Sequence, residues 1–263
     1  MLENQAWIRL SIFLALFVLF ASLEQLLPKR RQRDKKSKRW FTNLCLLLID
    51  SITLRLLALL LPLLAVGAAL DANAKDWGLF NYLDWSLWIE VALSLLILDF
   101  VIWFQHLISH KIPLLWRLHQ VHHADQEMDV TTGIRFHPIE IALSMILKVG
   151  AIYLLGPLAL AVIAYEALLN GMALFNHTNL RLPKSIEAVM RWVVVTPDMH
   201  RVHHSVHRHE HDSNYGNTLS LWDRVFRTYV SEPGTSHERM ELGLRWRDEK
   251  PRMLLWSLLL PFK

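Results

Sequence analysis

Three groups of histidines in this chain have the spacing of metal ligands on a helix. The first group is a pair separated by three residues, and the other two share a His-x-x-His-His pattern: His106 and His110; His119, His122 and His123; and His200, His203 and His204. Residues three and four positions apart are neighbours on a helical surface, so each group can direct its imidazole rings to one side of a helix. A lone histidine would more often coat a solvated face or sense pH. The repeated spacing favours metal binding.

Each His-x-x-His-His group can serve two metal ions. With 3.6 residues per turn, the second and third histidines of such a group point about 100° apart. Together the three groups supply eight imidazoles, and His177, at the end of an apolar segment, is a candidate ninth ligand. That number of ligands suits a site that holds a pair of metal ions.

Two further residues are candidates to contact a ligand histidine rather than a metal. Asp99 lies two helical turns before His106, on the same face, and His137 precedes a proline at the start of an apolar segment. The other histidines are expected to bind no metal, because they lie in charged or polar stretches: His207, His209, His211 and His237. Trp222 and Asp223 are expected to serve packing and capping.

The residue types narrow the choice of metal. The single cysteine, Cys45, excludes Cys-rich zinc sites and iron–sulfur patterns, and the HExxH helix of zinc proteases is absent from the sequence. Imidazole suits zinc, copper, iron and nickel, so the ligand type alone does not choose among these metals. A metal pair in a membrane protein, facing lipid, favours the activation of O2 against an unactivated C–H bond, and iron is the usual metal for that chemistry.

The elements that must position these histidines are membrane helices. Apolar residues make up 53% of the 263 residues, and the mean hydropathy is +0.24. A spanning helix needs about 20 mostly apolar residues. Three segments meet that length, at about 7–27, 44–70 and 86–105, and a fourth, 139–175, is long enough for a hairpin that turns at Gly156-Pro157. The stretch 253–262 is too short to span, so we expect it at the membrane interface or packed on the cap. The segments predict an all-α polytopic membrane protein with three spanning helices plus a hairpin.

A basic run between the first two segments sets the expected orientation. Residues 28–41 carry eight lysines and arginines and one acid. Such a run between apolar segments is typical of the cytoplasmic side and argues against nucleic-acid binding. Counting the spans then places residues 71–85 outside and every histidine on the cytoplasmic side. We expect two regions: residues 1–105, with the membrane helices and the basic loop, and residues 106–263, the histidine-rich catalytic region.

At these residues the chain resembles the fatty acid hydroxylase/sterol desaturase superfamily of integral-membrane di-iron oxygenases. The resemblance runs from about residue 99 to residue 229, and its motifs occur in order: Asp99-x6-His106-x3-His110, the two His-x-x-His-His groups, Arg135-Phe136-His137-Pro138-Ile139-Glu140, Asn176-His177-Thr178-Asn179, and Asn214-Tyr215-Gly216 with Trp222-Asp223-x2-Phe226-x-Thr228-Tyr229. It implies a helical membrane fold with a cytosolic cap that holds the histidines, and two iron ions on nine of them: His106, His110, His119, His122, His123, His177, His200, His203 and His204.

The resemblance also implies O2-dependent hydroxylation or desaturation of a membrane lipid. The chain contains no GxGxxG and no CxxCH motif, so its electrons must come from a separate donor that docks on the cytoplasmic face. Two other classes stay open. A membrane zinc hydrolase would need an open metal site and a nearby glutamate base, and a metal-ion transporter or sensor would act on no lipid.

Overall fold

The structure is a computed structural model that describes residues 5–32, 36–60, 64–83, 85–245 and 250–263. Within these ranges the chain is helical, and β-structure is limited to three isolated bridges. The prediction of an all-helical fold is confirmed. Arg33, Asp34 and Lys35 of the basic run lie outside the described residues.

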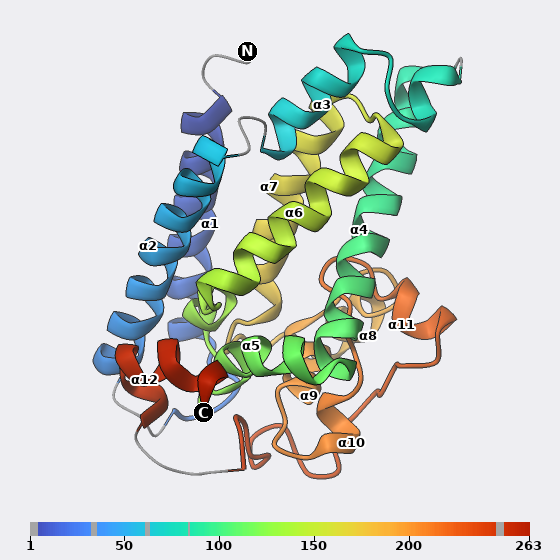
Figure 1. The fold of residues 1–263 in the computed structure, drawn as a ribbon. Helices are drawn as coiled ribbons and strands as arrows, with labels where there is room; N and C mark the ends of the chain where they lie inside the picture. The colour runs from blue at the N-terminus through green and yellow to red at the C-terminus, as the bar shows by residue number, and fades with distance from the viewer. Residues whose placement is uncertain (1–4, 33–35, 61–63, 84, 246–249) are drawn as a thin grey trace.

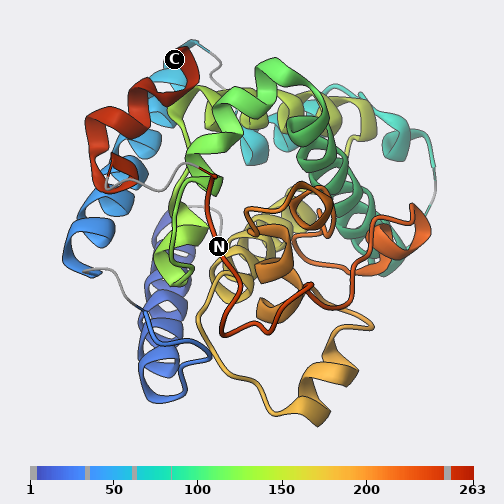
Figure 2. The ribbon, with the colours of Figure 1, turned by 90° about the horizontal axis from the view of Figure 1, so that it is seen from below.

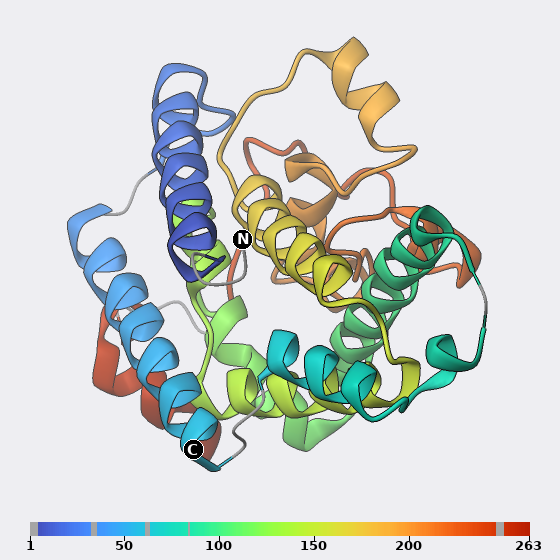
Figure 3. The same cartoon turned by 90° about the horizontal axis from the view of Figure 1, so that it is seen from above.

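Five helices in the described chain are long and apolar enough to cross a membrane: α1 (Gln5–Leu26), α2 (Lys36–Leu60), α4 (Leu87–Lys111), α6 (Pro138–Leu155) and α7 (Ala159–Asn176). Many of their apolar side chains are exposed, such as Val18 and Leu48, which are 62% and 61% exposed. Seen from above, α1 and α2 lie on one side of the bundle and α4 on the other, with α6 and α7 between them (Figure 3). Such a bundle indicates an integral membrane protein.

The predicted boundaries of the second segment are wrong. Helix α2 begins at Lys36, before the apolar run, and ends at Leu60, while residues 65–70 belong to a separate helix, α3 (Ala65–Ala74). Lysine and arginine are good helix formers, so the basic residues extend α2 although they carry no hydropathy signal. Residues 61–63 of the predicted segment lie outside the described residues. The ten-residue α3 is too short to span and buries its alanines against α6 and α7.

The predicted hairpin is present as α6 and α7. Helix α6 ends at Gly156, which has a left-handed φ of 66° and donates its N–H to the Ile152 carbonyl. The loop from α3 approaches this turn closely, because a Cβ on Gly78 would lie 2.2 Å from the Gly156 nitrogen. Only glycine at both positions allows the two backbones to meet. The short helix η2 (Leu79–Tyr82) lies in the same loop.

The remaining helices gather at the opposite end of the bundle, and we call this part of the molecule the cap (Figure 1). It consists of α5 (Pro113–His123), η3 (Val130–Ile134), α8 (Lys184–Met190), α9 (Pro197–His203), α10 (Arg208–His211), α11 (Leu221–Val225), η4 (Lys250–Arg252), α12 (Leu254–Leu259) and η5 (Leu260–Phe262). From below, α9 and α10 lie over the middle of the bundle end (Figure 2). The C-terminal stretch packs one face on Leu46 and Val121, while Leu255 and Phe262 stay exposed.

Candidate metal centre

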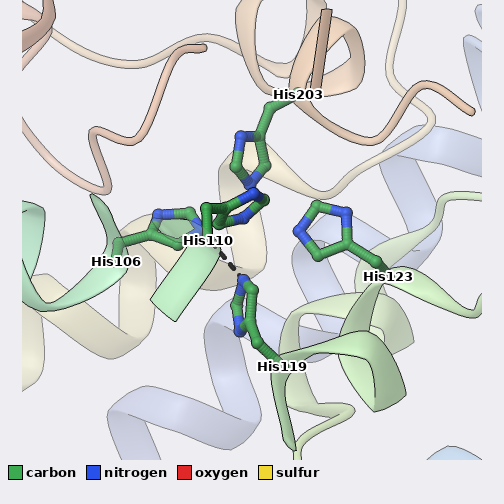
Figure 4. Close-up of side chains that lie close together, drawn as sticks. All are labelled: His106, His110, His119, His123 and His203. Carbon is green, nitrogen blue, oxygen red and sulfur yellow. Dashed lines mark hydrogen bonds between the residues drawn. The ribbon is translucent and has the colours of Figure 1, made fainter. Parts of the chain in front are cut away.

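Nine histidine side chains converge where the bundle meets the cap, and they form two groups. Each histidine of a group offers one ring nitrogen, and within a group these nitrogens all lie within 4.8 Å of one another. The first group contains five residues, whose rings point toward a common centre in Figure 4: His106, His110, His119, His123 and His203. The second contains four: His122, His177, His200 and His204. These are the nine residues that the sequence singles out, so the structure brings all of them together.

Each His-x-x-His-His group divides between the two clusters, as helical geometry predicts. In α5, His119 and His123 face the first cluster, whereas His122 faces the second. In α9 the division is reversed, because His203 joins the first cluster while His200 and His204 join the second. Neighbouring histidines in the sequence therefore link two adjacent sites, and the His123 and His204 rings stack at 4.5 Å between centroids.

Hydrogen bonds at Nδ1 orient five of the nine rings. Four rings point Nδ1 at a backbone carbonyl, and one points it at a carboxylate: His106 at Tyr215 (2.7 Å), His122 at Arg135 (3.1 Å), His177 at Ala173 (2.6 Å), His203 at Ser213 (2.6 Å) and His119 at Glu140 (2.6 Å). A carbonyl or carboxylate oxygen accepts, so Nδ1 carries the proton and donates it. The Nε2 lone pair is then left for a metal, which is the usual arrangement around metal-bound histidines.

A cation between the rings would satisfy two close contacts. In the first cluster Nε2 of His106 lies 3.1 Å from Nε2 of His119, and in the second Nε2 of His122 lies 3.1 Å from Nε2 of His177. Since all four rings donate from Nδ1, each contact sets two lone pairs against one another. No proton is available on either side to bridge them. A metal ion in each cluster would turn the repulsion into coordination, so the residues fit a pair of metals.

Burial keeps six of the clustered imidazoles neutral. Burial, with the neighbouring histidines as a smaller cause, lowers the pKa well below 6.5 for five rings outside the spanning helices: His122, His123, His200, His203 and His204. Burial also lowers the pKa of His177, to about 4. A neutral imidazole is the form that binds a metal, so the protein holds the site ready at ordinary pH.

The structure assigns Asp99 and His137 other partners. The Asp99 carboxylate accepts from the Leu219 amide (3.2 Å) and the Trp222 indole (3.0 Å), not from a clustered histidine. His137 caps α6 by accepting from the Ile139 amide, and its Nε2 lies 3.2 Å from the Leu258 carbonyl. The expectation that these two residues contact ligand histidines is wrong, because tertiary packing directs both side chains to other segments.

Glu140 fills the role expected of Asp99, and the sequence argument did not single it out. It lies in the first turn of α6, is 8% exposed, and its carboxylate accepts from Nδ1 of His119 at 2.6 Å. A carboxylate that holds the distal nitrogen of a ligand histidine orients the ring and raises its basicity. The Arg135–Glu140 motif carried the signal, since its acid lies in the first turn of the helix that Pro138 begins.

A buried ion pair ties α5 to α2. Arg39 is 2% exposed; it donates to both carboxylate oxygens of Asp125 at 2.7 and 2.8 Å and to Asp129 at 2.9 Å. Asp125 follows His123 by two residues, so the pair holds the end of the ligand helix. Arg39 belongs to the basic run that sets the expected orientation of the chain, but its side chain is internal.

The Asn214–Tyr229 motif supports His106 from the cap. Asp223 accepts from the Tyr215 and Gly216 amides at 2.9 and 2.8 Å and from the Trp103 indole at 3.1 Å. These bonds position the Tyr215 carbonyl that receives Nδ1–H of His106. The structural role expected for Asp223 matches these contacts.

Of the histidines expected to bind no metal, two are less exposed than a hydrated loop predicts. His211 stacks on Trp116 at 5.4 Å and lies near His110, and these two histidines form a third, smaller group with Asp212. His237 is 7% exposed, 3.3 Å from a Glu232 carboxylate oxygen. The side chain of His209 is 78% exposed, as expected of a loop residue.

The sequence profile of the fatty acid hydroxylase family matches residues 91–228, slightly more than half of the chain. The chain belongs to the fatty acid hydroxylase family. The matched region includes every clustered histidine, and the family resemblance noted in the motifs is confirmed. The family relationship also confirms the expected enzyme class, that of the oxidoreductases.

Among curated proteins the chain is similar to ornithine lipid hydroxylase OlsE of Rhizobium tropici, with 26% identity over 227 residues, 86% of this chain and 68% of that protein. It is also similar to alkylglycerol monooxygenase of Xenopus tropicalis, with 32% identity over 148 residues, and of Homo sapiens, with 28% over 178 residues. Those alignments cover 56% and 65% of this chain but only 31% and 36% of the monooxygenases. No solved structure gives a significant match.

Proposed function

We propose that this protein is an O2-dependent di-iron hydroxylase that acts on a C–H bond of a membrane lipid. The observation that carries the proposal is the same in both histidine clusters. Two Nε2 atoms lie 3.1 Å apart with their lone pairs facing each other. One iron would be held by the five-histidine cluster and the other by the four-histidine cluster. Bound iron supplies the O2 activation against an unactivated carbon that amino-acid side chains cannot provide.

The protein's own residues prepare the site. Glu140 and the backbone carbonyls of Tyr215, Arg135, Ala173 and Ser213 hold the proton on Nδ1, which keeps each Nε2 free. The clustered histidines other than His106 are at most 6% exposed, so bulk water has little access to the metal positions. A dry site protects a strong oxidant from side reactions.

A lipid substrate is supported by the spanning helices and by the names of the relatives. The substrates in those names are an ornithine lipid and an alkylglycerol. A lipid substrate would reach the bundle from the surrounding bilayer. The same names favour hydroxylation over desaturation, two outcomes that share the first hydrogen abstraction.

The electrons would come from a separate protein that docks on the cap. The basic run between α1 and α2 supports a cytoplasmic position of the cap, by the positive-inside rule. A soluble reductase or small electron carrier would reach the histidine clusters from that side. A membrane zinc hydrolase and a metal-ion transporter or sensor are the rival functions, and neither would consume O2.

Metal content and product formation test the proposal together. We expect the purified protein to hold two irons per chain, and extracts of cells with the gene to contain an oxidised lipid in air but not without oxygen. His122→Ala and His203→Ala, one from each cluster, should each lose iron and activity, because metal affinity depends on the number of ligands. His209→Ala is the matched control and should keep both. Two zinc ions in protein made with iron available would favour the hydrolase, and metal flux without a lipid product would favour the transporter.

A further inference from the structure

Two elements of the cap expose apolar side chains to the outside of the molecule. At the end of α8, Val189 is 71% exposed, and the next segment exposes Trp192 (69%) and Val193 (61%). Around α11, Val225 and Phe226 are 58% and 49% exposed. Monomeric soluble surfaces rarely gather so many large apolar side chains, and such a patch usually marks an interaction site.

These side chains belong to one continuous surface, which we call the α8–α11 surface. The Ser220 amide donates to the Val193 carbonyl at 3.1 Å, and Val194 and Leu219 form a bridge, so the two segments run side by side. The Arg224 guanidinium lies 4.4 Å from the centroid of the Trp192 ring.

The α8–α11 surface lies at the level of the membrane-spanning part of α4. Asp99 of α4 bonds to the Trp222 indole at 3.0 Å, and the Trp103 and Phe226 rings stack at 4.6 Å. Asp99 precedes His106 by seven residues, which is about 10 Å along the helix axis. In Figure 1, α8 and α11 correspondingly lie nearer the level of the spanning helices, along the bundle axis, than α10 does.

The surroundings of the surface match a lipid leaflet. Seen from above, α8 projects beyond the outline of the spanning helices, where lipid would lie over it (Figure 3). Tryptophan favours the boundary between headgroups and acyl chains. Lys184 and Arg227 are exposed beside the apolar side chains, and basic residues at this depth attract anionic headgroups.

We propose that the α8–α11 surface is inserted in the anionic lipid leaflet that faces the cap, at the boundary between headgroups and acyl chains. The apolar side chains continue the lipid-facing surface of α4, and Lys184 and Arg227 contact lipid phosphates. The inference goes beyond the proposed hydroxylase activity and depends only on the spanning helices crossing a bilayer. It places the histidine clusters directly beneath the leaflet. A lipid chain then reaches them after moving only a short distance out of the bilayer.

Site-directed fluorescence in nanodiscs tests this placement. In a Cys45→Ala background, an environment-sensitive dye is attached at Val193→Cys or Val225→Cys, in anionic lipid with or without bromine on the acyl chains. Leu48→Cys, on the outer face of α2, is the control within the bilayer, and His209→Cys is the control in water. We expect brominated lipid to quench the dye at 193 and 225 as it does at 48, and aqueous iodide to quench only the dye at 209.

Each other outcome has a distinct meaning. Iodide quenching at 193 and 225 equal to that at 209 would overturn the proposal. Protection from both quenchers would also overturn it, since a second copy of the chain or another protein would then cover the surface. Loss of bromine quenching at 48 would instead overturn the membrane-spanning assignment. The double variant Lys184→Glu, Arg227→Glu should weaken bromine quenching of the dye at 193 and leave the quenching at 48 unchanged. Unchanged quenching at 193 would contradict the proposed contact of these two basic residues with anionic lipid.

Discussion

Replacing Arg39 by methionine should destabilise the cap and release metal from the centre. The Arg39 guanidinium donates two bonds to Asp125, one to Asp129 and one to the Glu127 carbonyl, and the arginine is 2% exposed. Methionine fills much of the same volume but leaves both carboxylates buried without their cation. Because Asp125 follows the ligand helix α5 directly, the change acts on the ligand-bearing part of the cap.

The size of the effect follows from the charge that is left behind. Removing one partner of a buried ion pair costs about 3–5 kcal/mol. The pKa of Asp125 gives a second measure. Burial alone would raise it, yet Arg39, with smaller contributions from Arg135 and the Thr132 hydroxyl, lowers it from 3.8 to about 2, a net shift of about 2 kcal/mol. Since this pKa is lowered, its contribution to stability is present above about pH 4 and is lost as the pH falls toward 2. We therefore expect a loss of about 2–5 kcal/mol at neutral pH.

Thermal unfolding and iron content of the purified variants measure the effect. A loss of this size should lower Tm by roughly 4–20 °C for a chain of this length. Lys38→Met, an exposed lysine in the same basic run, is the matched control and should change stability by less than about 0.5 kcal/mol. The Tm of Arg39→Lys should lie between those of Arg39→Met and Lys38→Met, because lysine keeps the charge but cannot bond to both carboxylate oxygens of Asp125 as arginine does. Equal Tm and iron content in Arg39→Met and Lys38→Met would refute the reasoning.

Three further predictions concern the centre and its orientation. Glu140→Ala should weaken iron binding by about 10–100-fold, because it frees Nδ1 of His119; a chelator titration would measure this, and unchanged affinity would contradict it. Gly133→Ala should cost about 1–3 kcal/mol and lower iron occupancy, since its Cβ would lie 2.5 Å from a backbone oxygen of α7; a Tm and iron content equal to those of the parent would disprove the close approach. Single cysteines at Lys75 and Arg208 should be labelled from opposite sides of the membrane, and labelling from the same side would contradict the topology.

The predictable part of the site depends on residues that are close together in the chain. His122 and His123 belong to one helix, so helical geometry alone predicts that they point about 100° apart and can serve different sites. The hairpin turn was predictable at Gly156 for a similar reason, because one local backbone conformation ends the helix. The start of α2 was not predictable, since hydropathy does not detect the helix-forming basic residues before the apolar run.

The contacts that escaped prediction join residues far apart in the chain. Asp99 has the right spacing to face His106, but packing of the Asn214–Tyr229 motif against α4 gives it Trp222, 123 positions away. Arg39 has the same sequence context as the exposed Lys38, and only the packing of η3 and the loop before it on α2 brings it to Asp125. Asp99 and Arg39 could each pair with several side chains elsewhere in the chain, so spacing along the sequence cannot tell which pair forms.

The sequence by itself determined the residues that can bind metal, the division of each His-x-x-His-His group and the helices long enough to span a membrane. Covalent spacing and apolar length control these features, and both can be seen along a single helix. The tertiary structure decided which carbonyls and which carboxylate hold the ligand rings, and it set their Nε2 atoms face to face. Those choices depend on how separate helices dock, and docking is settled by the burial and pairing of the whole chain at once.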